Sequence, residues 1–174
     1  MSTNLQFITS FPITASQEAT DMDNIFSDQY DTYQLVFTGF ATVGTSDENI
    51  NLRIIDNSGT LDANNVYDYA VLEIRADTSF SENKNDGFGR IDRLMKINDI
   101  PDGMSCVLYV HNPTLSSSFT FFHWQSSGNF SGQSRGFKGI AVHKVAETIR
   151  GLRIFGSNGG RPYDTGKISV YGVK

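Results

Sequence analysis

Three histidines are the side chains in this sequence best suited to metal binding or acid–base chemistry: His111, His123 and His143. A metal site of the cupin type, within a jelly roll, needs a His-x-His pair with an acidic residue nearby, and no such pair occurs here. The sequence therefore predicts no local metal site. A site assembled from a histidine and an aspartate that are distant in the sequence remains open.

Nucleophilic chemistry has no recognisable signature either. The sequence has a single cysteine, Cys106, so an intrachain disulfide is ruled out. Cys106 lies in the apolar run 106–110, which predicts a small core residue. The chain contains no Gly-x-Ser-x-Gly motif and no Walker A loop. Its fourteen Asp and five Glu offer too many pairs to single out a glycosidase-like couple. We expect a non-enzymatic protein with no catalytic residue, no metal and no cofactor.

An acidic loop at 56–62 offers oxygen ligands of the kind that calcium prefers. The loop lacks the spacing of an EF-hand and its closing glutamate. Asp and Asn at turns are explained more simply by hydrogen bonds to their own backbone. The sequence leaves calcium binding open.

The run 119–124 places bulky side chains on both faces of one predicted strand. Phe119, Phe121 and His123 share one face, and Phe122 and Trp124 share the other. Such a strand is either central in the core, part of a subunit interface, or a platform on which a sugar ring stacks. We include Phe122 and Trp124 among the candidate interface residues.

The composition is that of a globular, β-rich chain with an acidic surface. The 174 residues carry a net charge of −5 and a pI near 5.0, which argues against nucleic acid as a partner. Arg150, Arg153 and Arg161 form a weak basic group that we interpret as solvated strand and loop charge. The first residues do not form a signal peptide, and no apolar stretch is long enough to span a membrane.

Alternation of apolar and polar residues predicts strands nearly everywhere. Turn residues such as Asn57-Ser58-Gly59 and Asn112-Pro113 separate the strands. We expect the residues 126–136 to form a long exposed loop, and 15–25 to hold at most one short helical turn. The fold class is all-β, an antiparallel and jelly-roll-like β-sandwich with about ten strands. Their expected ranges are 5–13, 31–40, 50–56, 66–76, 89–97, 104–111, 118–125, 137–146, 148–156 and 166–173.

We divide the chain into an N-terminal arm with the first strand, residues 1–25, and a single β-sandwich domain, residues 26–174. The arm is expected to pack on a neighbouring subunit. Its apolar side chains Leu5, Phe7, Ile8 and Phe11 complete the set of candidate interface residues.

Two stretches resemble a known family. The first is 24–36, a turn that leads into an early strand, and the second is the closing pair 149–157 and 165–172, separated by a glycine-rich loop. Together they resemble small β-sandwich virion proteins of tailed bacteriophages, notably phages of marine and cyanobacterial hosts. The resemblance implies a scaffold that leaves the cell by lysis, is often trimeric, and has no catalytic signature. It transfers no binding residue to this chain.

The resulting expectation is a structural protein of a tailed-phage virion, in particular a capsid decoration or cement protein. Its expected partners are other virion proteins, namely the major capsid protein or tail proteins, and copies of itself in a homo-oligomer, as a trimer. Neither nucleic acid nor membrane is an expected partner. The alternatives are a tail, baseplate or fibre component that binds a host glycan, a carbohydrate-binding module, or an enzyme such as a depolymerase.

Overall fold

The computed structural model describes residues 4–14, 17–42, 47–77, 80–98, 103–130, 132–157 and 163–174. Within these ranges the protein contains twelve strands and no helix, and every strand pairing is antiparallel. None of the described segments is a long apolar helix of the kind that crosses a membrane. The strands are β1 (Leu5–Ile13), β2 (Ala19–Met22), β3 (Thr32–Ala41), β4 (Glu48–Asp56), β5 (Tyr67–Arg75), β6 (Ser81–Phe88), β7 (Ile91–Ile97), β8 (Met104–His111), β9 (Thr120–Phe130), β10 (Gln133–His143), β11 (Ile149–Gly156) and β12 (Thr165–Val173).

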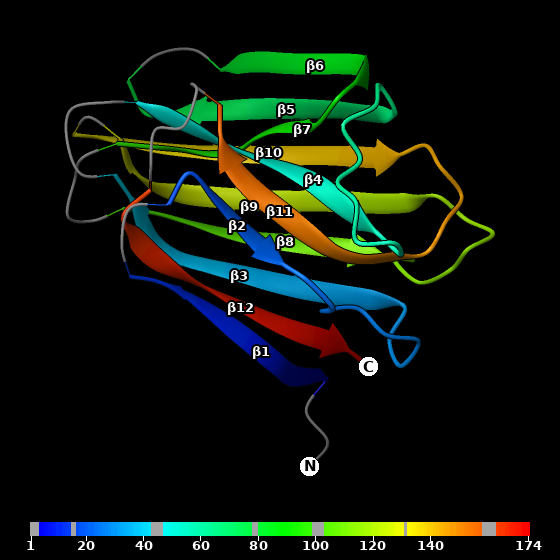
Figure 1. Ribbon diagram of the computed structural model, residues 1–174. Coiled ribbons are helices and arrows are strands. Elements are labelled where there is room, and N and C mark those ends of the chain that lie inside the picture. The colour runs from blue at the N-terminus through cyan, green and yellow to red at the C-terminus, as the bar shows by residue number, and fades with distance from the viewer. Residues whose placement is uncertain are drawn as a thin grey trace.

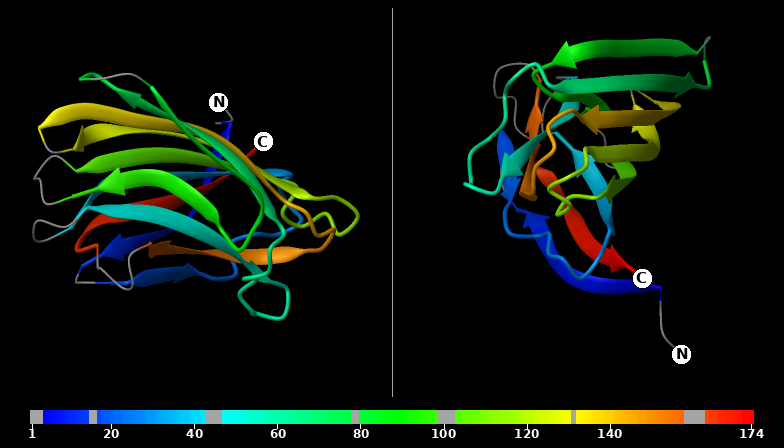
Figure 2. Two further views of the ribbon diagram at one scale, coloured as in Figure 1. Left: turned by 90° about the horizontal axis from the view of Figure 1, so that it is seen from above. Right: turned by 90° about the vertical axis from the view of Figure 1, so that its right-hand side faces the viewer.

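Two sheets form the layers of a sandwich (Figure 1). The larger sheet has eight strands in the order β1-β12-β3-β8-β9-β10-β5-β6, and the smaller has four in the order β2-β11-β4-β7. Figure 2 shows the smaller sheet lying across one face of the larger one. The predicted all-β, jelly-roll-like antiparallel β-sandwich is confirmed.

The core fills the space between the sheets and is rich in aromatic rings. Its largest fully buried side chains include Trp124, Tyr33, Tyr67, Tyr163 and Phe137. Each of the three tyrosines uses its hydroxyl to hold a neighbouring segment; Tyr33, for example, donates to the Ser27 carbonyl oxygen at 2.7 Å. These three buried hydroxyls are thereby hydrogen-bonded, as buried polar groups generally are.

Three segments differ from the sequence expectation. Residues 126–130 and 133–136 belong to β9 and β10 rather than to a long loop, and Ser126 and Phe130 are buried on the inner face. Gly128 permits this close packing, since a Cβ there would collide with the Gly103 carbonyl oxygen. Within 15–25, the described part contains the strand β2 in place of a helical turn, and β6 is an additional strand.

The N-terminal segment is built into the sheet. The strand β1 pairs with β12 from Leu5 opposite Val173 to Ile13 opposite Gly166, which makes it one edge of the larger sheet. The start of β1 and the end of β12 therefore lie side by side in the lower part of Figure 1. Residues 5–13 pack on their own chain, and an additional contact with a neighbouring subunit stays a prediction.

Candidate functional site on the outer face of the eight-stranded sheet

The register of the eight-stranded sheet aligns side chains in rows on the face that points away from the four-stranded sheet. We call this surface the outer face. Strands β3, β8, β9 and β5 alternate buried and more exposed residues, so every second side chain belongs to it. One row crosses all eight strands and consists of Phe7, Tyr171, Gln34, Tyr109, His123, Ile140, Ala70 and Lys84.

A stack of three rings stands at the centre of the outer face. The ring of Tyr109 lies nearly parallel to that of His123 at a centroid distance of 4.7 Å, and the ring of His111 is nearly parallel to that of His123 at 5.1 Å. Tyr109 also accepts a hydrogen bond from Gln34 Nε2 at 2.6 Å. The three ring planes are nearly parallel, and the short contact between ring nitrogens places the two imidazoles edge to edge.

Burial favours the neutral form of both histidines in this stack. Nε2 of His111 and Nδ1 of His123 are 3.0 Å apart, and Nδ1 of His111 is 3.0 Å from the hydroxyl of Thr32. Burial lowers the pKa of both histidines, and the charge of His123 lowers the pKa of His111 further. Both rings are therefore neutral near pH 7, and one donates a hydrogen bond to the other.

Apolar side chains extend from the stack towards β5. Ile140 is 64% exposed and Phe121 is 45% exposed, although both are large hydrophobic residues. Leu72 and Ile74 of β5 are exposed on the same face, at 36% and 38%. Exposed apolar groups that gather on one surface mark interaction sites far more often than isolated ones do.

Three adjoining depressions follow this apolar surface. One of about 540 Å³ is lined by Phe121, Ile140 and His111, and it shares His123 with a second of about 540 Å³ over β3 and β8. A third of about 420 Å³ lies between β5, β6 and β10 and shares Ile140 with the first. Polar side chains surround them, including Asp68, Asn85, Glu82, Lys84, Lys138 and Gln125.

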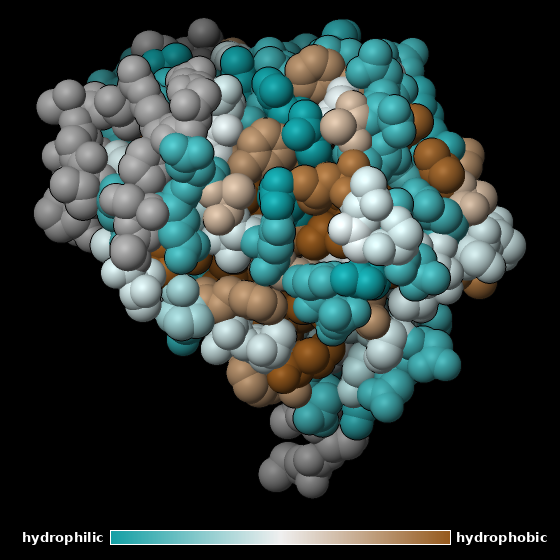
Figure 3. Space-filling view, viewed as in Figure 1, coloured by the Kyte–Doolittle hydropathy of each residue, from teal (hydrophilic) through white to brown (hydrophobic). Residues whose placement is uncertain are grey.

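The opposite side of the sandwich has a different character. Figure 3 shows hydrophilic and hydrophobic residues intermingled over the four-stranded sheet. Arg150 is paired there with Asp23, and Arg153 with Asp21. These ion pairs agree with the interpretation of the arginines as surface charge; Arg161 lies outside the described residues.

The candidate interface residues fall into two groups. Phe122 and Trp124 are only 2% and 1% exposed and belong to the core, where the Trp124 indole donates to the Arg93 carbonyl oxygen at 3.3 Å. This corrects their assignment to an interface, because their side of β9 faces the four-stranded sheet. The alternate residues of β9, Phe121 and His123, face outward instead.

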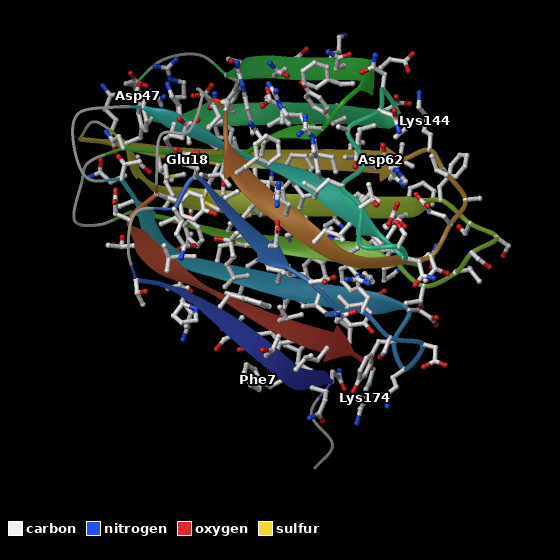
Figure 4. All side chains as sticks on the ribbon, in the orientation of Figure 1. Phe7, Glu18, Asp47, Asp62, Lys144 and Lys174 are labelled. Atoms are coloured by element: carbon white, nitrogen blue, oxygen red, sulfur yellow. The ribbon has the colours of Figure 1, made fainter. Side chains whose placement is uncertain are left out.

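The N-terminal candidates lie at the surface, with one exception. Leu5, Phe7 and Ile8 are exposed on the edge strand β1, and the Phe7 ring meets Tyr171 edge-on at 5.7 Å. Figure 4 shows Phe7 at this edge of the molecule, on the same side as Lys174. Phe11 is half-buried and packs against the core. Their contact with a partner stays a prediction.

The structure explains two features that the sequence raised as possible reactive or ion-binding groups, the thiol of Cys106 and the acidic loop 56–62. Cys106 is buried, and burial raises the pKa of its thiol, so it offers no accessible nucleophile. In the acidic loop, one carboxylate oxygen of Asp56 accepts hydrogen bonds from the backbone of Ser58 and Thr60 and from the Ser58 hydroxyl. These bonds lower the Asp56 pKa and account for the loop as a turn.

Comparisons with known proteins find structural likeness only. No family model and no curated protein sequence matches the chain. Among solved structures, an alginate lyase from Aplysia kurodai is 11% identical over 85% of this chain and 70% of its own, with a TM-score of 0.33. The VP2 protein of infectious bursal disease virus is 12% identical over 95% of this chain and 40% of its own, with a TM-score of 0.13. Likeness at this level carries no functional conclusion.

Proposed function

We propose that this chain is a non-enzymatic structural protein of a tailed-phage virion that is held in the particle by its outer face. The resemblance of 24–36 and of the closing strands to phage virion proteins supports the class. The position that we favour is that of a capsid decoration or cement protein, which contacts the major capsid protein or further copies of itself.

One observation supports attachment through the outer face. Ile140, Phe121, Leu72 and Ile74 gather exposed apolar surface on a rigid sheet, within a polar rim. An interface typically combines such an apolar centre with a polar border. The burial of Trp124, the single tryptophan of the sequence, supports assembly over glycan binding, because it removes a ring well suited to stack on a sugar.

Purified particles of the phage that encodes the chain provide the test. We expect the chain to be present, and quantitative mass spectrometry against the major capsid protein gives its copy number. Hundreds of copies per particle support decoration, whereas a few to tens favour the tail, baseplate or fibre. Complete absence from the particles would contradict the proposal.

A pair of variants tests the outer face itself. Ile140→Asp places a charge at its centre and should release the chain from the particle without unfolding it, because the side chain is 64% exposed. Leu115→Asp is the matched control, since Leu115 is 50% exposed in the segment between β8 and β9. Equal retention of both variants would exclude the outer face as the attachment surface.

A further inference from the structure

A second group of ionisable side chains lies at the end of the sandwich, away from the outer face. Asp62 belongs to the segment between β4 and β5, His143 is the last residue of β10, and Glu147 follows it before β11. Figure 4 places Asp62 at the right-hand end of the molecule. His143 lies on the same face of β10 as the buried residue Ala141, so its ring points inward.

The three side chains converge on one nitrogen atom. His143 Nε2 is 2.8 Å from Asp62 Oδ2 and 3.7 Å from Glu147 Oε1. The potential ligand atoms of all three residues lie within 4.8 Å of one another. The imidazole is fully buried, whereas the Glu147 side chain is 31% exposed, so solvent reaches the cluster from that side.

The surrounding residues hold Asp62 in place. Its Oδ1 accepts hydrogen bonds from the backbone N–H and the side-chain amide of Asn64, both at 2.8 Å, which leaves Oδ2 to face His143. The Tyr67 hydroxyl donates to the Asp62 carbonyl oxygen at 2.9 Å, and the Tyr67 ring lies 5.1 Å from the imidazole. Supporting contacts of this kind orient the ligands of a metal site in advance.

Within the described residues, the two carboxylates of the cluster have no direct ion pair with a lysine or arginine, and Arg53 acts on Asp62 only at longer range. Two carboxylates share one imidazole, and the nearby Lys144 is directed to Asp68 at 2.6 Å and Asp86 at 3.0 Å. His143 Nδ1 is buried and has no hydrogen-bond partner in the described part of the chain. In the described part of the chain, the hydrogen bond of the ring is therefore made through Nε2, the atom that faces both carboxylates.

We propose that Asp62, His143 and Glu147 bind a divalent transition-metal ion of the Zn²⁺ class through Oδ2, Nε2 and Oε1. One imidazole with two carboxylates suits such an ion, whereas calcium and magnesium prefer oxygen ligands alone. Ligands of a tetrahedral Zn²⁺ at about 2.1 Å are separated by roughly 3.4 Å. The observed 2.8 and 3.7 Å from Nε2 lie on either side of that separation.

The bound ion would join three separate segments. It ties the β4–β5 segment, which leads from the smaller sheet to the larger, to the end of β10 and to the start of the connection back to β11. Because binding requires the folded arrangement, the ion stabilises the folded state. A water molecule from the side where Glu147 is exposed would complete the coordination of the ion.

Calorimetric titration of the full-length, untagged chain with Zn²⁺ tests the proposal, with Ca²⁺ and Mg²⁺ titrated in parallel. We expect one Zn²⁺ per chain, a higher melting temperature with Zn²⁺, and much weaker binding of the other two ions. Glu147→Gln and Asp62→Asn should each weaken Zn²⁺ binding by at least about tenfold. Glu82→Gln, which changes an exposed glutamate on β6, should bind as the unaltered chain does.

A second control separates this site from the histidines of the outer face. His123→Gln should leave Zn²⁺ binding intact, because His123 does not belong to the cluster. The proposal is overturned if the unaltered chain does not bind Zn²⁺, or if Glu147→Gln binds as tightly as Glu82→Gln. Loss of binding in His123→Gln with retention in Glu147→Gln would also overturn it. Since Glu147 is half-buried, its variant stays informative even if Asp62→Asn fails to fold.

Discussion

Truncation of two adjacent phenylalanines in β9 should destabilise the fold to very different extents. Phe122 is 2% exposed and faces the core, whereas Phe121 is 45% exposed on the outer face. We expect Phe122→Ala to lower the free energy of unfolding by about 3–5 kcal/mol, because it removes buried contacts and leaves a cavity. Phe121→Ala should lower it by only about 1 kcal/mol, because about half of that side chain is already in water.

Urea unfolding followed by far-UV circular dichroism measures both values, and the fluorescence of Trp124 serves as a second probe. At this chain length the difference corresponds to roughly 10 °C in melting temperature between the two variants. The order should be reversed for particle attachment, where Phe121→Ala weakens binding although its fold is intact. Equal destabilisation by the two variants would refute the assignment of the two faces of β9.

Three further outcomes follow from the structure. Gly139→Ala should lower the free energy of unfolding by about 1–3 kcal/mol in urea titrations, because the added Cβ overlaps the Trp124 ring. The folded chain holds the pKa of His111 and of His123 below the unfolded value of 6.5, so the free energy of unfolding should fall as the pH drops below 6.5. His123→Gln should make that fall shallower in unfolding measurements at a series of pH values. Cys106 should resist a thiol reagent in the folded chain and react fully in urea, as absorbance of the released product would show.

The alternation of residue types predicts most of the strands, but it does not determine which face of β9 is buried. Phe119, Phe121 and Phe122 place aromatic groups on both sides of that strand, so the pattern does not indicate which side is buried. The choice follows from the packing of Trp124 and Phe122 beneath the four-stranded sheet. Because successive side chains of a strand point to opposite faces, a wrong choice of the buried face reverses the burial predicted for every residue of the strand.

The missed strands have physical explanations of a different kind. The residues of β6 are mostly polar, and this edge strand is held by its backbone pairing with β5 rather than by an apolar face. The end of β9 contains serines and a glycine, which favour loops in sequence-based reasoning. Its burial comes from neighbouring strands that no local pattern shows.

The two groups of functional candidates depend on long-range register. Tyr109 meets His123 because β8 and β9 pair in that register, and each side chain alone resembles an ordinary strand residue. Asp62 and His143 are brought together from distant parts of the chain by the connection between the sheets. A sequence can propose such partners only as one combination among many.

A cryo-electron microscopy map of the phage particle that contains this chain would test the central proposal most directly. We expect density of a neighbouring subunit against Phe121 and Ile140, with the polar rim of the outer face at its border. A map in which the chain is attached by another surface, and in which Ile140 faces open solvent, would contradict the proposal.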